Sequence, residues 1–166
     1  MRLYLLRHAR AEIVGDAARD DSRGLTEEGL REAAGVGSWL STRSEPPTHV
    51  LCSPARRAVE TMERVIAALL EKPATSISED LYLGSAWKLF EKVRGTEPGV
   101  SSLMLVGHNP GIAELAAKLS GRGDPAALRS LARRFPPATL AEMEPSATSW
   151  AALEPDGTRL VSHFVA

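Results

Sequence analysis

The sequence predicts an α/β fold, a single-domain three-layer α/β/α sandwich with a mostly parallel central sheet and antiparallel C-terminal edge strands. Two patterns predict this class. Between residues 2 and 120, short apolar runs alternate with segments of helical periodicity. From residue 139 onward, apolar and polar side chains alternate instead, and a Pro-Asp-Gly turn signal lies among them. The length of 166 residues suits one domain, 1–166, and no repeat or linker divides it.

The N-terminal third is expected to contain two strands and the helix between them. Residues 2–6 form a continuous apolar run that is typical of a short buried strand. A helix is expected over 26–44, because Glu27 and Glu28 stand in its first turn, where the helix dipole favours carboxylates. A second strand follows at 48–52, after a loop that contains two prolines.

The middle of the chain repeats this alternation. The stretch "SPARRAVETMERVIAALLEK" predicts a helix over 54–71 with a proline near its start. Residues 84–94 carry a weaker helical pattern, and 101–106 form a third apolar strand. A helix over 111–119 follows that strand and ends before Gly121.

The tail of the chain is expected to form antiparallel strands. Three alternating stretches, "TLAEME", "SWAALEP" and "RLVSHFV", follow one another there. The "PDG" between the last two is a hairpin signal. The segment 121–138, which precedes them, has no clear pattern and is expected to be irregular.

Composition and charge favour a cytoplasmic protein that binds neither nucleic acid nor a membrane. The net charge of −1 provides no general surface for a polyanion. No apolar run approaches the roughly 20 residues that a membrane-spanning helix needs, and the N-terminus is charged too early for a signal peptide. The one cysteine, Cys52, fits a reducing compartment. No cofactor or metal is expected, because neither a Cys/His cluster with zinc spacing nor a glycine-rich nucleotide loop is present.

Each of the three predicted parallel strands ends in polar side chains. The first ends in Arg7 and His8, the second is followed by Arg56 and Arg57, and the third is followed by His108. Because the carboxyl ends of parallel strands share one edge of a sheet, these side chains are expected to converge there. Arginine forks and helix N-termini suit phosphate oxygens. The sequence therefore predicts an anion site that contains two histidines.

Five short motifs occur in order along the chain. They are "LLRHARAE", "DDSRGLTEEG" with Arg23, "CSPARRAVET", "LVGHNPG" with His108, and "RRFPPATLAEME". In this order they resemble the histidine phosphatase superfamily, and within it the small SixA-like phosphohistidine phosphatases. The third motif selects Arg57 rather than Arg56. Ala9 departs from most of the superfamily, which has glycine after the first histidine.

This resemblance implies a metal-independent phosphatase that forms a phosphohistidine on its own chain. His8 would be the nucleophile. Arg7, Arg57 and His108 would hold the phosphoryl oxygens, and Arg23 would be a further clamp. The implied substrate is a phosphorylated protein that carries phosphohistidine, and a small phosphomonoester is the alternative.

Larger members of the superfamily use an acidic residue after the second helix to protonate the leaving group. In this chain Glu79 and Asp80 are the candidates for that acid, and neither fits a clear pattern. Phosphohistidine would need such an acid less, because imidazole, with an ordinary pKa of about 6.5, protonates readily.

Other functions remain open at this stage. One is a small-molecule phosphomonoesterase or a phosphoglycerate mutase-like enzyme of the same superfamily. Another is a catalytically silent phosphate-binding module, since the same residues would make a good phosphate receptor. A cysteine phosphatase is disfavoured, because Arg57 follows Cys52 one residue too early for that motif and the loop between them lacks glycine.

Overall fold

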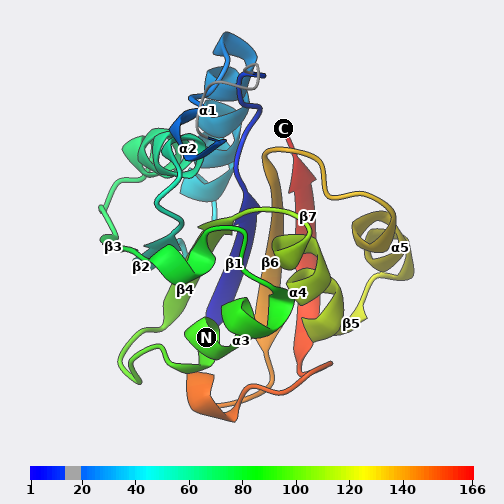
Figure 1. Ribbon diagram of the computed structural model, residues 1–166. Helices are drawn as coiled ribbons and strands as arrows, with labels where there is room; N and C mark the ends of the chain where they lie inside the picture. Colours follow the sequence, from blue (N-terminus) through cyan, green and yellow to red (C-terminus); the bar gives the residue numbers. More distant parts are fainter. Residues whose placement is uncertain (14–19) are drawn as a thin grey trace.

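The computed structural model describes residues 1–13 and 20–166, which form one seven-stranded sheet with helices on both faces (Figure 1). The strands are β1 (Arg2–Arg7), β2 (His49–Cys52), β3 (Ala74–Ile77), β4 (Ser102–Gly107), β5 (Ser120–Gly123), β6 (Thr139–Pro145) and β7 (Thr158–Val165). The helices are α1 (Glu27–Ser41), α2 (Arg56–Ala67), α3 (Ala86–Arg94), α4 (Gly111–Leu119) and α5 (Pro125–Arg133). Three short 3-10 helices, η1 (Asp20–Ser22), η2 (Glu79–Leu81) and η3 (Trp150–Ala152), lie in the connections.

The strand order β3-β2-β4-β1-β6-β7-β5 places β1 at the centre of the sheet. β1, β4, β2 and β3 pair in parallel, whereas β6 is antiparallel to both β1 and β7. The expected α/β class, with a mostly parallel sheet and antiparallel pairing near the C-terminus, is therefore confirmed. The edge of the sheet on that side is β5, which pairs in parallel with β7.

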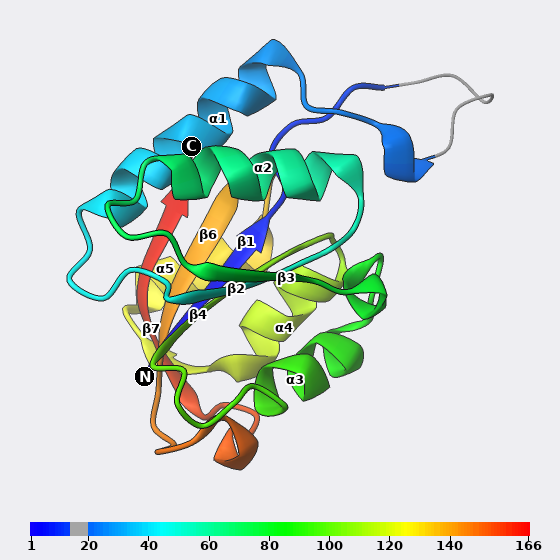
Figure 2. The same cartoon turned by 90° about the vertical axis from the view of Figure 1, so that its left-hand side faces the viewer.

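The sheet separates two apolar cores. α1 and α2 cover one face, and α3 and α4 cover the other (Figure 2). The side chains of β1 alternate between the two cores, with Leu3 and Leu5 in one and Tyr4 and Leu6 in the other. All four are fully buried. Each leucine stabilises the fold by about 1.5–3 kcal/mol, because its apolar surface is removed from water. The central strand is thereby fixed from both sides.

The predicted bounds of α4 are confirmed, whereas α1, α2 and α3 are each shorter than predicted by a few residues. α1 begins after its N-cap residue Thr26, whose hydroxyl accepts a hydrogen bond from the Gly29 N–H at 3.0 Å. α2 begins only at Arg56 and ends at Ala67, short of the predicted 54–71. Lys72 lies just beyond this end, where its ammonium group donates to the carbonyls of Ile66 and Ala67 in the last turn and of Leu69 after it, and so satisfies acceptors that a longer helix would have used.

Two expectations for the C-terminal half are wrong. The stretch "SWAALEP" is not a strand, since it contains η3, where Trp150 is fully buried and its indole N–H donates to the Val100 carbonyl at 2.7 Å. The antiparallel pair is instead β6 with β7. The segment 121–138 is not irregular, because it contains most of β5 and all of α5. Asp124 caps α5 by accepting from the Ala127 N–H at 2.8 Å, a local signal that periodicity alone does not detect.

β3 was also absent from the predicted elements. Its four residues are all exposed at the edge of the sheet, so their sequence carries no apolar pattern. Among the described residues, no helix is long and apolar enough to cross a membrane.

The start of α4 lies unusually close to the loop that leads into α3. A Cβ atom on Gly111 would lie 2.0 Å from the carbonyl oxygen of Gly84, which is backbone and cannot swing aside. Glycine is therefore required at this position for a steric reason, and the contact fixes the turn between β4 and α4.

We expect Gly111→Ala to lower the free energy of unfolding by about 1–3 kcal/mol, because one of the two backbones must shift. Urea denaturation monitored by circular dichroism measures the change. Gly99→Ala is the matched control, since a Cβ there meets nothing within 4 Å. Equal stability of the two variants would show that the close approach at Gly111 carries no energetic cost.

Candidate active site

Three strand ends meet at one edge of the sheet, as the sequence predicted. β1 and β4 are in register with Arg7 beside Gly107, and β2 and β4 with Cys52 beside Val106. Parallel pairing continues one residue further, because the His8 N–H donates to the Gly107 carbonyl at 3.1 Å and the Ser53 N–H to the Val106 carbonyl at 3.0 Å. The polar residues that follow the three strands are therefore held side by side by the sheet itself.

His8 lies at the centre of this edge with 9% of its surface exposed. Its Nδ1 is 2.7 Å from the Ala9 carbonyl oxygen, which can only accept a hydrogen bond. Nδ1 therefore carries the proton, and Nε2 of the neutral ring presents a lone pair. The Nε–H of Arg57 points at that lone pair from 3.3 Å.

The loop after His8 is tied to α2. The Ala9 N–H donates to the Thr61 hydroxyl at 3.0 Å, and that hydroxyl donates to the Arg57 carbonyl at 2.6 Å. These bonds connect Ala9, whose carbonyl orients the His8 ring, to the backbone of Arg57 through the Thr61 hydroxyl.

His108 is the second buried histidine of the site. Its ring centroid is 5.1 Å from that of His8, and its Nε2 is 2.7 Å from the Ser53 hydroxyl. Its Nδ1 lies 3.3 Å from Nη2 of Arg57, which can only donate. The neutral ring therefore carries its proton on Nε2, donates it to Ser53, and accepts from Arg57 through Nδ1.

Both imidazole rings are neutral near pH 7. Burial is the largest cause, and it lowers the pKa of His8 to about 4, against the Ala9 hydrogen bond that raises it, with the charge of Arg57 adding to the lowering. Burial also lowers the pKa of His108 to about 3, and the positive charges of His8, in its protonated form, and of Arg57 lower it further. A ring that keeps its lone pair at neutral pH can act as a nucleophile.

Two adjacent arginines of α2 point in different directions. Arg57 is 2% exposed, and its Nη1 and Nη2 donate to the backbone oxygen and the carboxylate of Asp20 at 2.6 and 2.8 Å. Arg56 has 63% of its side chain exposed and pairs with Glu60 on the helix surface at 2.6 Å. The structure thus brings Arg57, and not Arg56, to the two histidines.

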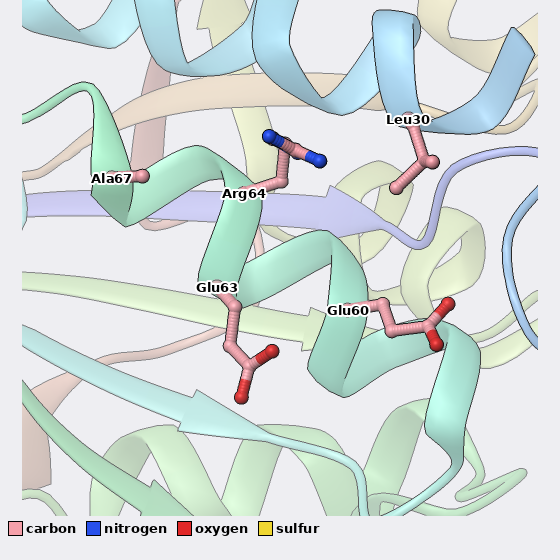
Figure 3. A pocket seen from close by; sticks show the side chains of 5 residues that line it. All are labelled: Leu30, Glu60, Glu63, Arg64 and Ala67. Carbon is pink, nitrogen blue, oxygen red and sulfur yellow. The ribbon is translucent and has the colours of Figure 1, made fainter. Parts of the chain in front are cut away.

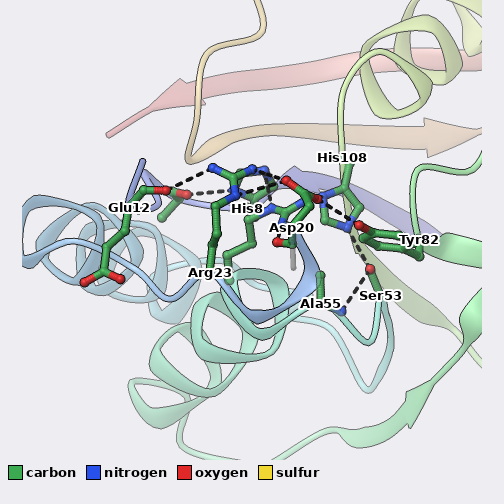
Figure 4. Close-up of polar contacts among 10 residues, drawn as sticks. His8, Glu12, Asp20, Arg23, Ser53, Ala55, Tyr82 and His108 are labelled. Atoms are coloured by element: carbon green, nitrogen blue, oxygen red, sulfur yellow. Dashed lines mark hydrogen bonds and ion pairs between the residues drawn. The ribbon is translucent and has the colours of Figure 1, made fainter. Parts of the chain in front are cut away.

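Asp20 is a site residue that the sequence analysis missed (Figure 4). Arg23 donates to its Oδ1 from Nε and Nη2 at 3.0 and 2.7 Å, and the Tyr82 hydroxyl donates to its Oδ2 at 2.8 Å. The pKa of Asp20 lies well below its usual range, because its carboxylate accepts hydrogen bonds from Tyr82, Arg23 and Arg57. Arg23 therefore reaches the site through Asp20, and its Nη1 donates to the Glu12 carbonyl at 3.0 Å.

Tyr82 completes this side of the site, and it too was missed. Its ring lies edge-on to that of His108, with the centroids 5.6 Å apart. No motif marked Tyr82, but the run of acidic residues just before Arg23 was a visible signal for Asp20.

Arg7 lies at the site, and not all of its N–H groups have a hydrogen-bond partner among the described residues. Its Nη1 donates to the Phe135 carbonyl at 2.8 Å, which also accepts from the Asn109 amide at 2.9 Å. Its Nε is buried and has no hydrogen-bond partner among the described residues. A bound anion could supply the missing acceptor.

The two acidic candidates after α2 lie outside this cluster. Asp80 pairs with Lys92 of α3 at 2.7 Å and has 55% of its side chain exposed, and Glu79 is exposed beside it. Asp20 is the described carboxylate that pairs with Arg57, whose guanidinium contacts both histidines.

Cys52 is fully buried at the end of β2, within the core under α1 and α2. Its thiol donates to the Ser53 carbonyl at 3.3 Å, and burial raises its pKa to about 12. Such a thiol is not a nucleophile near neutral pH, which argues against a cysteine phosphatase.

A separate hollow of about 350 Å³ lies between α1 and α2 (Figure 3). Leu30, Glu60, Glu63, Arg64 and Ala67 line it. Both oxygens of Glu60 are already engaged, one by the Leu25 N–H and one by Arg56. None of the groups that meet at the strand ends lines this hollow. Among the described residues, no three His, Cys, Asp or Glu side chains are grouped so as to hold a metal ion.

Known proteins match this chain in both sequence and fold. The model of the histidine phosphatase superfamily (branch 1) matches residues 3–81. An uncharacterized protein of Mycobacterium tuberculosis is 32% identical over 96% of this chain and 99% of its own length. The phosphohistidine phosphatase SixA of Escherichia coli is 31% identical over 72% of this chain and 74% of its own length.

A solved structure shares nearly the whole fold. It is that of a candidate phosphohistidine phosphatase SixA from Nakamurella multipartitia, which is 30% identical, with a TM-score of 0.83 over 98% of this chain and 94% of the other.

We expect His8 and His108 to stay neutral in the folded protein at about pH 5–6, where a free imidazole with a pKa of about 6.5 is largely protonated. An NMR titration of the imidazole nitrogens measures this, with the chain unfolded in urea as the control. Because the unfolded state binds these protons first, the free energy of unfolding falls as the pH drops from about 6.5 to about 4. Titration of both folded rings near 6.5 would contradict the expectation.

Proposed function

The chain belongs to the histidine phosphatase superfamily, and we propose that it is a metal-independent phosphatase that removes phosphate from phosphohistidine on a partner protein. The phosphate passes through a covalent intermediate on His8. Arg7, Arg57 and His108 hold the phosphoryl oxygens, and Arg23 supports them through Asp20.

The observation that carries this proposal is the tautomer of His8. The Ala9 carbonyl holds the proton on Nδ1, so the lone pair of Nε2 faces the donors of Arg57. A neutral, oriented imidazole beside a buried guanidinium suits attack on a phosphoryl group, whose charge the arginine stabilises in the transition state.

The reaction takes two steps that balance without a metal. In the first, a bond forms between Nε2 of His8 and phosphorus, the bond to the leaving group breaks, and its electron pair departs with that group. In the second, the oxygen of a water molecule bonds to phosphorus, the phosphorus–nitrogen bond breaks and returns its electron pair to Nε2, and both protons of the water leave with the phosphate. His108 accepts a hydrogen bond from Arg57 at Nδ1, so it must take up a proton there before it can donate to a phosphoryl oxygen.

Two observations favour phosphohistidine over an ester as the substrate. Glu79 and Asp80 lie outside the cluster, so neither of them is in place to assist a poor leaving group. An imidazole that is protonated on its far nitrogen leaves as a neutral molecule and needs no such acid. The Escherichia coli relative SixA, a phosphohistidine phosphatase, agrees with this choice.

We expect the wild type to release phosphate from a phosphohistidine-bearing protein and His8→Ala to release none. Wild-type protein quenched during turnover should carry a phosphate that is acid-labile and base-stable, and the variant should carry no label. His49→Ala is the matched control, because His49 lies at the opposite end of β2. Release from p-nitrophenyl phosphate alone would move the substrate class to small phosphomonoesters. Phosphate binding without release from either substrate would favour a phosphate receptor.

The two adjacent arginines provide a second test. We expect Arg57→Ala to lower kcat/KM by about 10²–10³, as for the loss of one oxyanion donor, because its guanidinium contacts both histidines. Arg56→Ala should change kcat/KM by less than about threefold, since Arg56 lies on the surface beside Glu60. Circular dichroism checks that both variants are folded. The reverse order of the two effects would contradict the proposed roles.

A further inference from the structure

Asp20 brings a negative charge into direct contact with the cationic side chains of Arg57 and Arg23. Its carboxylate contacts Arg57, Arg23 and Tyr82, and 46% of its side chain is exposed, against 2% for Arg57. Asp20 therefore lies at the mouth of the site, above the buried histidines. A carboxylate at that position weakens the attraction of the site for anionic substrates, so its presence requires an explanation.

Arg57 uses two different edges of its guanidinium group. The edge formed by Nη1 and Nη2 holds the backbone oxygen and the carboxylate of Asp20. The edge formed by Nε and Nη2 faces Nε2 of His8 and Nδ1 of His108, both at 3.3 Å. A phosphoryl group bound between the histidines can use this second edge while Asp20 stays on the first. Asp20 can then stay in place while a phosphoryl group is bound, on the side of Arg57 that is open to solvent.

Tyr82 extends this negative end toward solvent. Its hydroxyl donates its proton to Asp20, so its oxygen is free to accept a hydrogen bond from an incoming group. The bond to a carboxylate makes that oxygen a stronger acceptor. Its ring also stands edge-on to His108. The mouth thus offers a carboxylate charge and a polarised acceptor, which together suit a cationic N–H group.

We propose that Asp20 and Tyr82 form the leaving-group side of the site and select substrates whose leaving group is a protonated imidazole over substrates that release an anion. This inference rests on the proposed function. When the phosphorus–nitrogen bond breaks, its electron pair returns to the ring, which departs as neutral imidazole with the proton still on its far nitrogen. When an ester bond breaks, negative charge develops on the departing oxygen, and the carboxylate of Asp20 opposes it.

The test compares two small substrates, phosphoimidazole and p-nitrophenyl phosphate, so that docking of a partner protein plays no part. We expect Asp20→Asn to lower kcat/KM for phosphoimidazole by about tenfold or more, as for removing the charge from a hydrogen-bonded pair. For the ester, which loses only the support that Asp20 gives to Arg57, kcat/KM should fall by a clearly smaller factor, so that the ratio of the two kcat/KM values changes. Tyr82→Phe should shift the ratio of the two kcat/KM values in the same direction by a smaller factor, and it leaves the ring against His108 intact.

Asp80→Asn is the matched control, because it removes an exposed carboxylate that pairs with Lys92 outside the site. It should leave the ratio unchanged. An equal fall for both substrates in Asp20→Asn and Tyr82→Phe would overturn the inference, because Asp20 would then be only a partner that positions Arg57. That result leaves the proposed function intact. If the wild type has no activity on phosphoimidazole, or if His8→Ala keeps that activity, the proposed function is overturned and the inference with it.

Discussion

The buried guanidinium of Arg57 is the group on which the rest of the site depends. A charge with 2% exposure has lost its water and must be compensated by hydrogen bonds or by an opposite charge. The structure supplies both, from Asp20 at one edge of the guanidinium and from two imidazole nitrogens at the other. Those nitrogens can accept only while their rings are neutral, so the position of Arg57 and the low pKa values of both histidines support each other.

The C-terminal half of the chain closes the site that the N-terminal half begins. The Phe135 carbonyl accepts from Arg7 and Asn109, and the Ala138 N–H donates to the His8 carbonyl at 3.1 Å. β6 starts at the next residue and runs back along β1 in the antiparallel direction. The antiparallel strand thus brings the end of α5 and its following loop to the centre of the sheet edge, which a purely parallel sheet would leave open.

The parts of the fold that could be predicted from the sequence are those whose cause is local. The apolar runs of β1, β2 and β4 and the polar residues just after them lie next to each other in the sequence, so parallel pairing was enough to bring His8, Arg57 and His108 together. Asp20 and Tyr82 reach the site through loops, from positions 37 and 62 residues away from their partners, and no periodic pattern encodes such contacts. β3 could not be predicted for a different reason, since a strand whose residues are all exposed shows no alternation of apolar and polar side chains. η3 was mistaken for a strand because one buried indole ring, and not a repeat, determines its conformation.

The position of Cys52 has a consequence for how such an enzyme would respond to oxidants. Peroxide inactivates phosphatases whose nucleophile is a thiolate, because the thiolate is oxidised to sulfenic acid. Cys52 is the one cysteine of this chain, it is fully buried, and its pKa of about 12 keeps it protonated. Imidazole does not enter that oxidation ladder. A phosphatase whose reacting group is an imidazole would therefore keep working at oxidant concentrations that inactivate cysteine phosphatases.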